Sequence, residues 1–166
     1  VSETVAAPSP VGFLPYLSGE RTPLNDPDAT GAFFGLRRAH GLPDLAQAVM
    51  EGVAFAFTDC VHALRKAGTP IEAAYAVGGG ARSRAWLRIM ASATGLRLLE
   101  PEDGDFGAAF GAAKLAAACA TGDTSERVFA KPAVRAEVVP DAALADAYTK
   151  KYEAYRAAYP RLRDLP

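Results

Sequence analysis

The sequence predicts an α/β domain in which helices lie against a short sheet. Short apolar strand patterns alternate with helical patterns from residue 31 to residue 120, and a run of glycines separates one predicted strand from the helix that follows it. At 166 residues, 50% of them hydrophobic, the chain is long enough to bury a core. We expect one domain over residues 11–166, preceded at residues 1–10 by a Pro- and Ala-rich linker or ragged edge.

The first part of the domain predicts a strand at residues 31–36, where aromatic residues gather, followed by a long helix. Asp44 is expected to cap this helix, apolar residues then recur at helical spacing, and Gly68 is expected to end it. Residues 18–27, which precede the strand, are polar and Pro-rich and predict an irregular loop.

The second part continues the alternation and ends on a helix. The predicted elements are strand 73–77, helix 83–94, strand 96–99, helix 106–120, an extended connector 132–139 and a last helix capped by Asp141. One face of the last helix carries Leu144, Tyr148, Tyr152, Tyr155, Tyr159 and Leu162. We interpret these tyrosines as packing residues rather than as a binding platform.

The helix at 106–120 consists mostly of glycine and alanine. Each glycine in a helix costs about 1 kcal/mol relative to alanine, so Gly107 and Gly111 need a compensating gain. Two interpretations stay open at this point. The helix packs tightly on the sheet, or its thin face leaves room for a ligand or lets two domains move past each other.

The glycine turn at residues 76–83 (AVGGGARS) is the first candidate for a binding site. Glycines let backbone N–H groups approach a ligand, and the N-terminus of the following helix has partial positive charge suited to phosphate. A tight turn also needs glycine for steric reasons alone. Gly78, Gly80 and Ser83 approximate a GxGxxG motif, and Glu100 follows Gly80 by twenty positions, so an NAD-dependent oxidoreductase is one alternative.

The charge composition limits the kinds of partner that the protein is expected to bind. Eighteen Lys and Arg against nineteen Asp and Glu give a net charge of −1, which argues against a nucleic-acid surface. No signal peptide or membrane span is visible, and we expect a cytoplasmic protein. Cys60 and Cys119 have no metal-binding spacing and are expected to be small buried hydrophobic residues in a reduced compartment, so no metal site is predicted.

Few other polar residues suggest chemistry. We expect Glu20 and Arg21 to form an ion pair that orders the Pro-rich loop, and Asp105 to cap the glycine-alanine helix rather than bind magnesium. His40 and His62 have no partner at metal or triad spacing and are interpreted as ordinary surface or core residues.

Several patterns together resemble the C-terminal domain of the FGGY family of carbohydrate kinases, and within it the xylulokinase branch. They are the loop at 13–23 (FLPYLSGERTP), residues 31–36 followed by 44–51, the glycine turn, and residues 104–116. Their order and spacing resemble the family from about Val11 to the last helix.

The resemblance implies an RNase-H-like domain half of the actin, hexokinase and Hsp70 ATPase superfamily, with ATP and Mg²⁺ between this half and a sister domain. The reaction implied is phosphoryl transfer to a sugar hydroxyl, xylulose being favoured. Arg84 stands where related glycerol kinases have an Asn near the adenine, so the resemblance does not imply a direct adenine contact there. The implied nucleotide-binding residues are Gly78, Gly79, Gly80, Ala81, Arg82 and Arg84, and the implied interdomain helix includes Asp105, Gly107 and Gly111.

Family members are considerably longer than this chain. Their sugar site, catalytic aspartate and first phosphate loop lie in an N-terminal domain, so no catalytic residue is expected here, and we expect the chain to be inactive alone. The implied partners are that domain, ATP and, through the domain, the sugar; a homodimer stays open. We expect exposed apolar surface around the glycine-alanine helix and the start of the chain. A non-enzymatic interaction module that keeps the half-fold is a second alternative.

Overall fold

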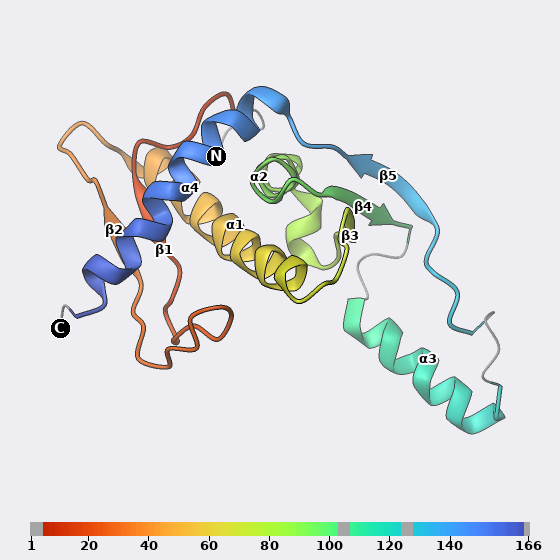
Figure 1. The fold of residues 1–166 in the computed structure, drawn as a ribbon. Coiled ribbons are helices and arrows are strands. Elements are labelled where there is room, and N and C mark those ends of the chain that lie inside the picture. Colours follow the sequence, from red (N-terminus) through yellow and green to blue (C-terminus); the bar gives the residue numbers. More distant parts are fainter. Residues whose placement is uncertain (1–4, 103–106, 124–127, 165–166) are drawn as a thin grey trace.

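The computed structural model describes residues 5–102, 107–123 and 128–164 (Figure 1). Helices and short strands alternate along the chain, which confirms the predicted α/β class. The helices are α1 (Leu42–Lys66), α2 (Arg84–Thr94), α3 (Gly107–Thr121) and α4 (Ala142–Leu162), and a short 3-10 helix, η1, covers Gly79–Arg82. The strands are β1 (Gly12–Leu14), β2 (Ala32–Phe34), β3 (Ala73–Tyr75), β4 (Arg97–Pro101) and β5 (Val134–Val138).

The strands form two small sheets. Strands β1 and β2 pair antiparallel, and the second sheet has the order β3-β4-β5. Strands β3 and β4 run parallel, with Ala74 opposite Leu98, whereas β5 runs antiparallel to β4, with Val138 opposite Leu98. The extended segment predicted at 132–139 therefore contains a strand, because β4 offers it a hydrogen-bonding edge.

Helix α1 begins differently from the prediction. Gly41 is the N-cap residue, and Asp44, three residues further on, accepts a hydrogen bond from the Gly41 N–H at 2.8 Å. The prediction that Asp44 is the N-cap is thus wrong by three positions, because its carboxylate reaches back to the cap from the first turn. The end of the helix is as predicted: Gly68 follows it with φ of +87°.

The core lies where α1 passes beneath α2 and α4 (Figure 1). Phe55 of α1 and Tyr148 of α4 are both buried, and their rings meet edge to face with centroids 5.6 Å apart. Tyr155 is also buried, and its hydroxyl lies 2.7 Å from that of Tyr16. Burial of these rings confirms the prediction that the tyrosines of the last helix are packing residues.

Two glycines allow close contacts of strand β1, one with α1 and one with a side chain of β2. A Cβ atom on Gly52 of α1 would lie 2.3 Å from the carbonyl oxygen of Phe13, and one on Gly12 would lie 2.1 Å from the ring of Phe34. Both distances are far inside van der Waals contact. At Gly52 the neighbouring atom is backbone, so glycine is required there by a contact within the chain itself.

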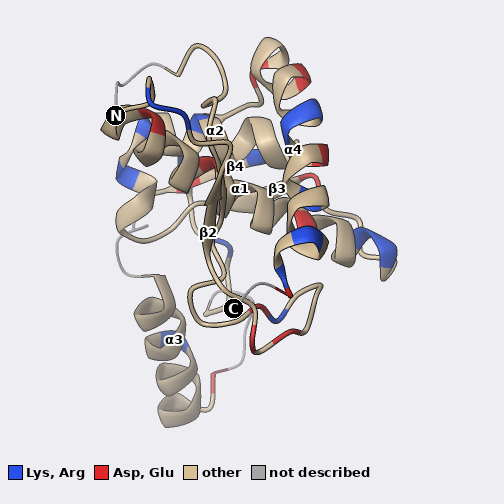
Figure 2. Ribbon diagram, turned by 90° about the vertical axis from the view of Figure 1, so that its left-hand side faces the viewer, with Lys and Arg blue, Asp and Glu red and all other residues tan. Residues whose placement is uncertain are grey.

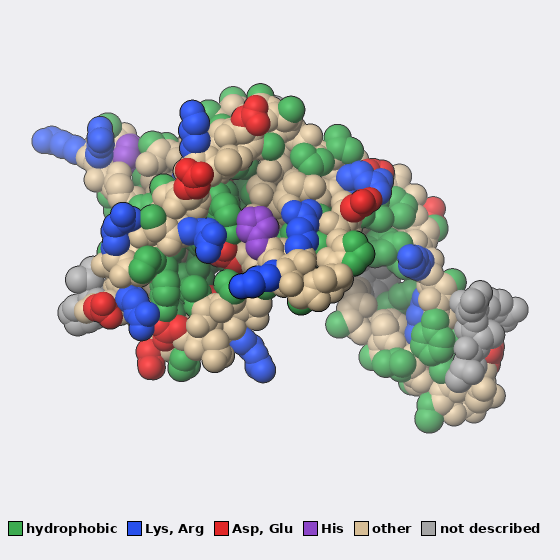
Figure 3. All heavy atoms as spheres, viewed as in Figure 1, with side chains coloured by type: hydrophobic (Ala, Val, Ile, Leu, Met, Phe, Trp, Pro, Cys, Tyr) green, Lys and Arg blue, Asp and Glu red, His purple; other side chains and the backbone are tan. Residues whose placement is uncertain are grey.

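Helix α3 projects away from the other elements (Figures 1 and 2). Of its residues only Ala118 is buried, while Phe110 is exposed and Leu115 is 64% exposed. Figure 3 shows hydrophobic side chains gathered over this helix. The expected apolar surface around α3 is confirmed, and the interpretation that α3 packs tightly on the sheet does not hold within this chain.

Other expectations about burial are only partly met. Cys119 lies on α3 and is exposed, so the prediction that it is buried is wrong, because α3 has no neighbouring layer to cover it. Cys60, on α1, is half-buried. Near the start of the chain Val5 and Val11 are buried, whereas Ala6, Ala7 and Pro10 are exposed, so the expectation is met there only in part. The division into residues 1–10 and 11–166 stays a prediction.

Candidate nucleotide-binding turn

The glycine turn connects β3 to α2 at the carboxyl edge of the parallel strands. The Ala76 N–H donates to the Leu99 carbonyl at 2.8 Å, which keeps the chain against β4 until the turn begins. Gly78 then adopts φ of +82°, η1 follows, and the Ser83 hydroxyl caps α2 by accepting from the Trp86 N–H at 3.3 Å. Binding residues gather at such edges in α/β proteins.

The three glycines of the turn have different reasons to be glycine. Gly78 has a backbone conformation that favours glycine. Gly80 packs against an indole, since a Cβ atom there would lie 3.1 Å from Nε1 of Trp86. Gly79 has neither reason: its φ is outside the left-handed range, and a Cβ atom would meet nothing within 4 Å in the described part of the chain. The space in front of Gly79 is therefore open to a ligand.

The two predicted arginines are placed differently. Arg82 ends η1 and lines, with Gly78, a crevice of about 60 Å³ beside the turn. Arg84, the first residue of α2, directs its guanidinium to the carboxylate of Glu100. Glu100 is buried at the end of β4, and Arg135 of β5 approaches its other oxygen at 3.5 Å. Sequence reasoning considered Glu100 only as a ribose-binding acid, although a cation in the first turn of α2 signalled a missing anion.

Helix α3 begins near the turn. A Cβ atom on Gly107, whose φ is +36°, would lie 3.8 Å from a methyl group of Val77, which immediately precedes the glycines. One turn further on, a Cβ atom on Gly111 would meet nothing within 4 Å. The predicted cap residue, Asp105, lies outside the described residues. Gly111 is thus a second position at which no contact in the described chain explains the glycine.

An apolar groove of about 480 Å³ runs beside the turn, between α1, β3 and α2. Its walls include Phe57, Leu64, Val77, Trp86 and Met90, and none of the described residues that line it is charged. Phe57, Leu64 and Val77 are exposed. A groove of this composition suits packing against polypeptide.

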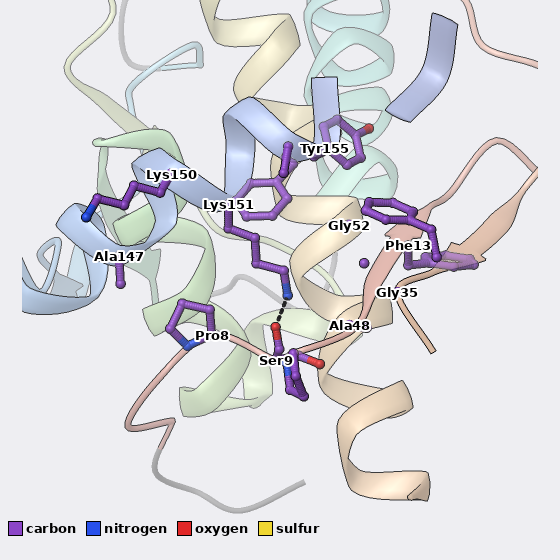
Figure 4. Close-up of a pocket in the computed structure, with 15 residues that line it drawn as sticks. Pro8, Ser9, Phe13, Gly35, Ala48, Gly52, Ala147, Lys150, Lys151 and Tyr155 are labelled. Carbon is purple, nitrogen blue, oxygen red and sulfur yellow. Dashed lines mark hydrogen bonds between the residues drawn. The ribbon is translucent and has the colours of Figure 1, made fainter. Parts of the chain in front are cut away.

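A second crevice, of about 370 Å³, lies between α1, α4 and the segment before β1 (Figure 4). Lys151 points across it and donates to the carbonyl oxygens of Ser9 at 2.6 Å and Val11 at 2.9 Å, and to the carboxylate of Glu51. Burial lowers the pKa of Lys151, and the Glu51 carboxylate opposes that effect. Since its donors are used within the protein, this lysine anchors the segment before β1.

The anchor is completed by groups around Glu51, which is fully buried. Its carboxylate accepts from the Ser9 N–H at 3.0 Å and from the Tyr148 hydroxyl at 3.1 Å. Burial, reinforced by the neighbouring carboxylate, raises the pKa of Tyr148. The cluster therefore joins α1, α4 and the first described residues into one unit.

The Pro-rich loop is ordered in another way than predicted. The carboxylate of Glu20 accepts from the Leu24 N–H at 2.7 Å, and between residues 5 and 102 no ion pair joins it to Arg21. The hydroxyl of Tyr159 also binds the carboxylate of Asp26, which lowers the pKa of that carboxyl. The prediction of a Glu20–Arg21 ion pair is wrong, because the Glu20 carboxylate binds the backbone N–H of Leu24 instead.

The described residues bring no group of three or more His, Cys, Asp and Glu side chains together as metal ligands. His62 lies beside a tyrosine instead, with Nδ1 3.1 Å from the Tyr152 hydroxyl, and His40 accepts from the Arg37 N–H at 3.1 Å. No helix in the described ranges is both long enough and apolar enough for a membrane span.

Comparison with solved structures places this arrangement in a known class. The chain superposes on a xyloylose kinase from Brucella ovis with a TM-score of 0.89 and 48% identity over 99% of its length. It also matches a Plasmodium falciparum glycerol kinase with ADP at a TM-score of 0.71 but only 18% identity, a likeness that shows the fold alone. The domain is therefore a mixed α/β half of the actin-like ATPase fold.

Sequence comparison gives the family. The model of the C-terminal domain of the FGGY family of carbohydrate kinases matches residues 1–120, and the chain belongs to this family. A xylulose kinase of Escherichia coli is 41% identical over 157 residues, which are 94% of this chain. This membership, together with the antiparallel β5, removes the support for the NAD-dependent alternative.

The chain spans about a third of the relatives it matches. It covers 32% of the Escherichia coli xylulose kinase and 34% of the Brucella ovis protein. These relatives are longer enzymes, and most of their length has no counterpart here.

Proposed function

We propose that this chain is the C-terminal, nucleotide-binding part of a kinase that transfers a phosphoryl group from ATP to xylulose. Similarity to xylulose kinases supports the choice of sugar, at 41% identity to the Escherichia coli protein and 48% to the Brucella ovis protein. ATP supplies the phosphoryl group in this reaction. We place the enzyme in the cytoplasm, where ATP is available.

The observation that carries the nucleotide assignment is the open space at Gly79. A residue that needs neither an unusual φ nor a close neighbour has no reason within the described chain to lack a side chain. A phosphate or ribose against the backbone supplies that reason, because a methyl group would stand in its way. In this proposal the backbone from Gly78 to Ala81 lines the nucleotide, with Arg82 at its end.

In this proposal magnesium binds together with ATP in the complete enzyme. Magnesium in kinases bridges phosphate oxygens of the nucleotide and needs only one or two protein carboxylates. We propose that the acid which accepts the sugar's proton, and the sugar site itself, lie in the part of the enzyme that this chain does not cover.

The partner of this chain is then the N-terminal domain of the same enzyme. Exposed Phe110 and Leu115 on α3 and the open side of Gly111 support a docking surface for it. Phosphoryl transfer depends on charges and reactants positioned from both sides of a cleft, so we propose that the chain alone is inactive.

The test uses the complete enzyme with ATP and a panel of ketoses and polyols, and measures ADP release. We expect xylulose to give the highest kcat/KM and this chain alone to give no turnover. If another sugar gives the highest kcat/KM, that sugar replaces xylulose as the proposed substrate. An intact, folded enzyme that releases no ADP with any of them would favour the non-enzymatic module.

A further inference from the structure

The carboxylate of Glu100 sits behind the glycine turn and joins three elements. It stands at the end of β4 with a side chain only 6% exposed. Arg84, at the start of α2, donates to one of its oxygens, and Arg135 of β5 approaches the other at 3.5 Å. A buried carboxylate is costly without partners, and here cations from two other elements supply them.

The pairing also explains why a cation begins α2. A positive charge in the first turn of a helix is unfavourable, because the N-terminus already carries partial positive charge. Arg84 is the first residue of α2, and this turn contains no acidic residue. The anion that Arg84 needs comes from Glu100, sixteen residues further along the chain.

Glu100 is in direct reach of the turn. Gly78, Ala81, Glu100 and Arg135 line the same crevice of about 60 Å³. The neighbouring residue of β4, Leu99, accepts a hydrogen bond from the Ala76 N–H through its carbonyl oxygen. Strand β4 is therefore attached to both ends of the turn, to Ala76 through Leu99 and to Arg84 through Glu100. A shift of Glu100 or Arg84 would be transmitted to the backbone between residues 78 and 84.

We propose that Glu100 is a positioning residue for the nucleotide: it holds Arg84 and Arg135 and thereby fixes the turn. Arg84 acts on the nucleotide through Glu100 and not by touching it. The inference rests on the proposed function, because it assigns the turn to ATP.

The test compares Glu100→Gln, Arg84→Met and the double variant in the complete enzyme. Binding of a non-hydrolysable ATP analogue is measured by calorimetry, and KM for ATP and for sugar by kinetics. We expect each single variant to weaken nucleotide binding about tenfold, as for neighbours in one network, with KM for the sugar unchanged. The double variant should be no weaker than either single variant, and Arg84→Lys should keep most of the affinity.

Direct contact between Arg84 and the nucleotide predicts another pattern. The effects of the two single variants would then multiply in the double variant. That result would overturn the inference, as would unchanged or tighter binding in Glu100→Gln.

A matched control lies on the same two strands. Arg97, at the opposite end of β4 from the turn, forms an ion pair at 3.1 Å with Glu137 of β5, which lies opposite Leu99. Glu137→Gln removes the carboxylate of an ion pair between the same two strands, from a more exposed position than Glu100, and should leave nucleotide binding unchanged. Equal weakening in Glu137→Gln would show a general effect of sheet stability and overturn the positioning role.

A readout without nucleotide separates this inference from the proposed function. Amide hydrogen exchange of residues 78–84 in the ligand-free enzyme should be faster in Glu100→Gln than in the wild type and unchanged in Glu137→Gln. A wild type that binds no nucleotide would refute the proposed function, while the exchange data still judge the role of Glu100 in the turn. Unaltered exchange with weakened binding would refute the positional mechanism.

Discussion

Gly52 in α1 and Gly79 in the turn both lack a side chain, for opposite reasons. At Gly52 a methyl group would lie 2.3 Å from a backbone oxygen of Phe13, whereas at Gly79 it would meet nothing within 4 Å. The first glycine is explained by contacts inside the chain and the second is not. The difference divides the molecule into a part that is complete by itself and a part that needs something further.

The helices show the same division. Helix α4 buries Tyr148 and Tyr155 against α1, while α3 buries only Ala118 and exposes Leu115. Contacts within the chain support the first arrangement. Substitutions at the glycines can therefore test whether the second depends on a ligand and a partner domain.

The largest expected effect is that of Gly52→Ala on stability. The added methyl group meets backbone that cannot move aside, and overpacking of this kind costs about 3 kcal/mol. Denaturant unfolding of the complete enzyme, followed through the transition of this domain, measures it. Gly79→Ala is the matched control for the same change of side chain, and equal stability of the two variants would contradict the comparison.

Gly79→Ala should leave the domain at least as stable as the wild type, because alanine can adopt this backbone conformation, and should weaken binding of an ATP analogue about tenfold, a loss of about 1.4 kcal/mol. In the proposed binding mode the methyl group occupies space that the nucleotide needs, while nothing in the described chain opposes it. Calorimetric titration of the complete enzyme measures the affinity. Wild-type affinity in this variant would show that the nucleotide does not approach Gly79.

Gly111→Ala should have opposite effects on stability and turnover. Alanine raises the intrinsic helix stability of α3 by about 1 kcal/mol, since the methyl group meets no neighbour. If a partner domain packs closely here, kcat/KM of the complete enzyme falls. Amide exchange in α3 and steady-state kinetics measure the two effects, and a slower-exchanging α3 with full activity would remove Gly111 from the docking surface.

The smallest effect is expected at Asp141, inside the well-packed part. Its carboxylate accepts from Arg88 at 2.6 Å and from the Leu144 N–H at 3.0 Å, and the hydrogen bond from Arg88 is the main cause that lowers its pKa. A lowered pKa in the folded state means that the stabilisation is present above the unfolded-state pKa of about 3.9. It is lost as pH falls through the folded-state value.

Asp141→Asn should keep the helix cap but lose the charge pair. Its Tm should fall below that of the wild type at pH 7, and the difference should shrink as the pH is lowered toward 3. Thermal unfolding at the two pH values measures this. A difference that grows on acidification would contradict the assigned pKa direction.

Local patterns in the sequence predicted much of the fold. Helical spacing and Gly68 predicted α1 and its end, and the glycine run predicted the turn after β3. The pairing of β5 could not be predicted, because its partner β4 lies more than thirty residues away along the chain. The same holds for the cluster of Ser9, Glu51 and Lys151, whose bonds join segments 42 to 142 residues apart.

The candidate site was predictable in outline only. The resemblance named the residues of the turn, but the open space at Gly79 depends on where every neighbouring element lies. The partner of Arg84 was likewise hidden, because any of several acids in the sequence could have met it. Cys119 shows the reverse error: an apolar helical sequence suggests burial, but burial requires a layer to pack against.

The packing of Trp86 against Gly80 has a practical consequence. Trp86 is the single tryptophan of this chain, and its indole nitrogen lies 3.1 Å from where a side chain on Gly80 would begin. Indole emission depends on the polarity and quenching around the ring. The chain thus carries its own fluorophore at the turn, whose spectrum can report occupation of the turn by a nucleotide without any label.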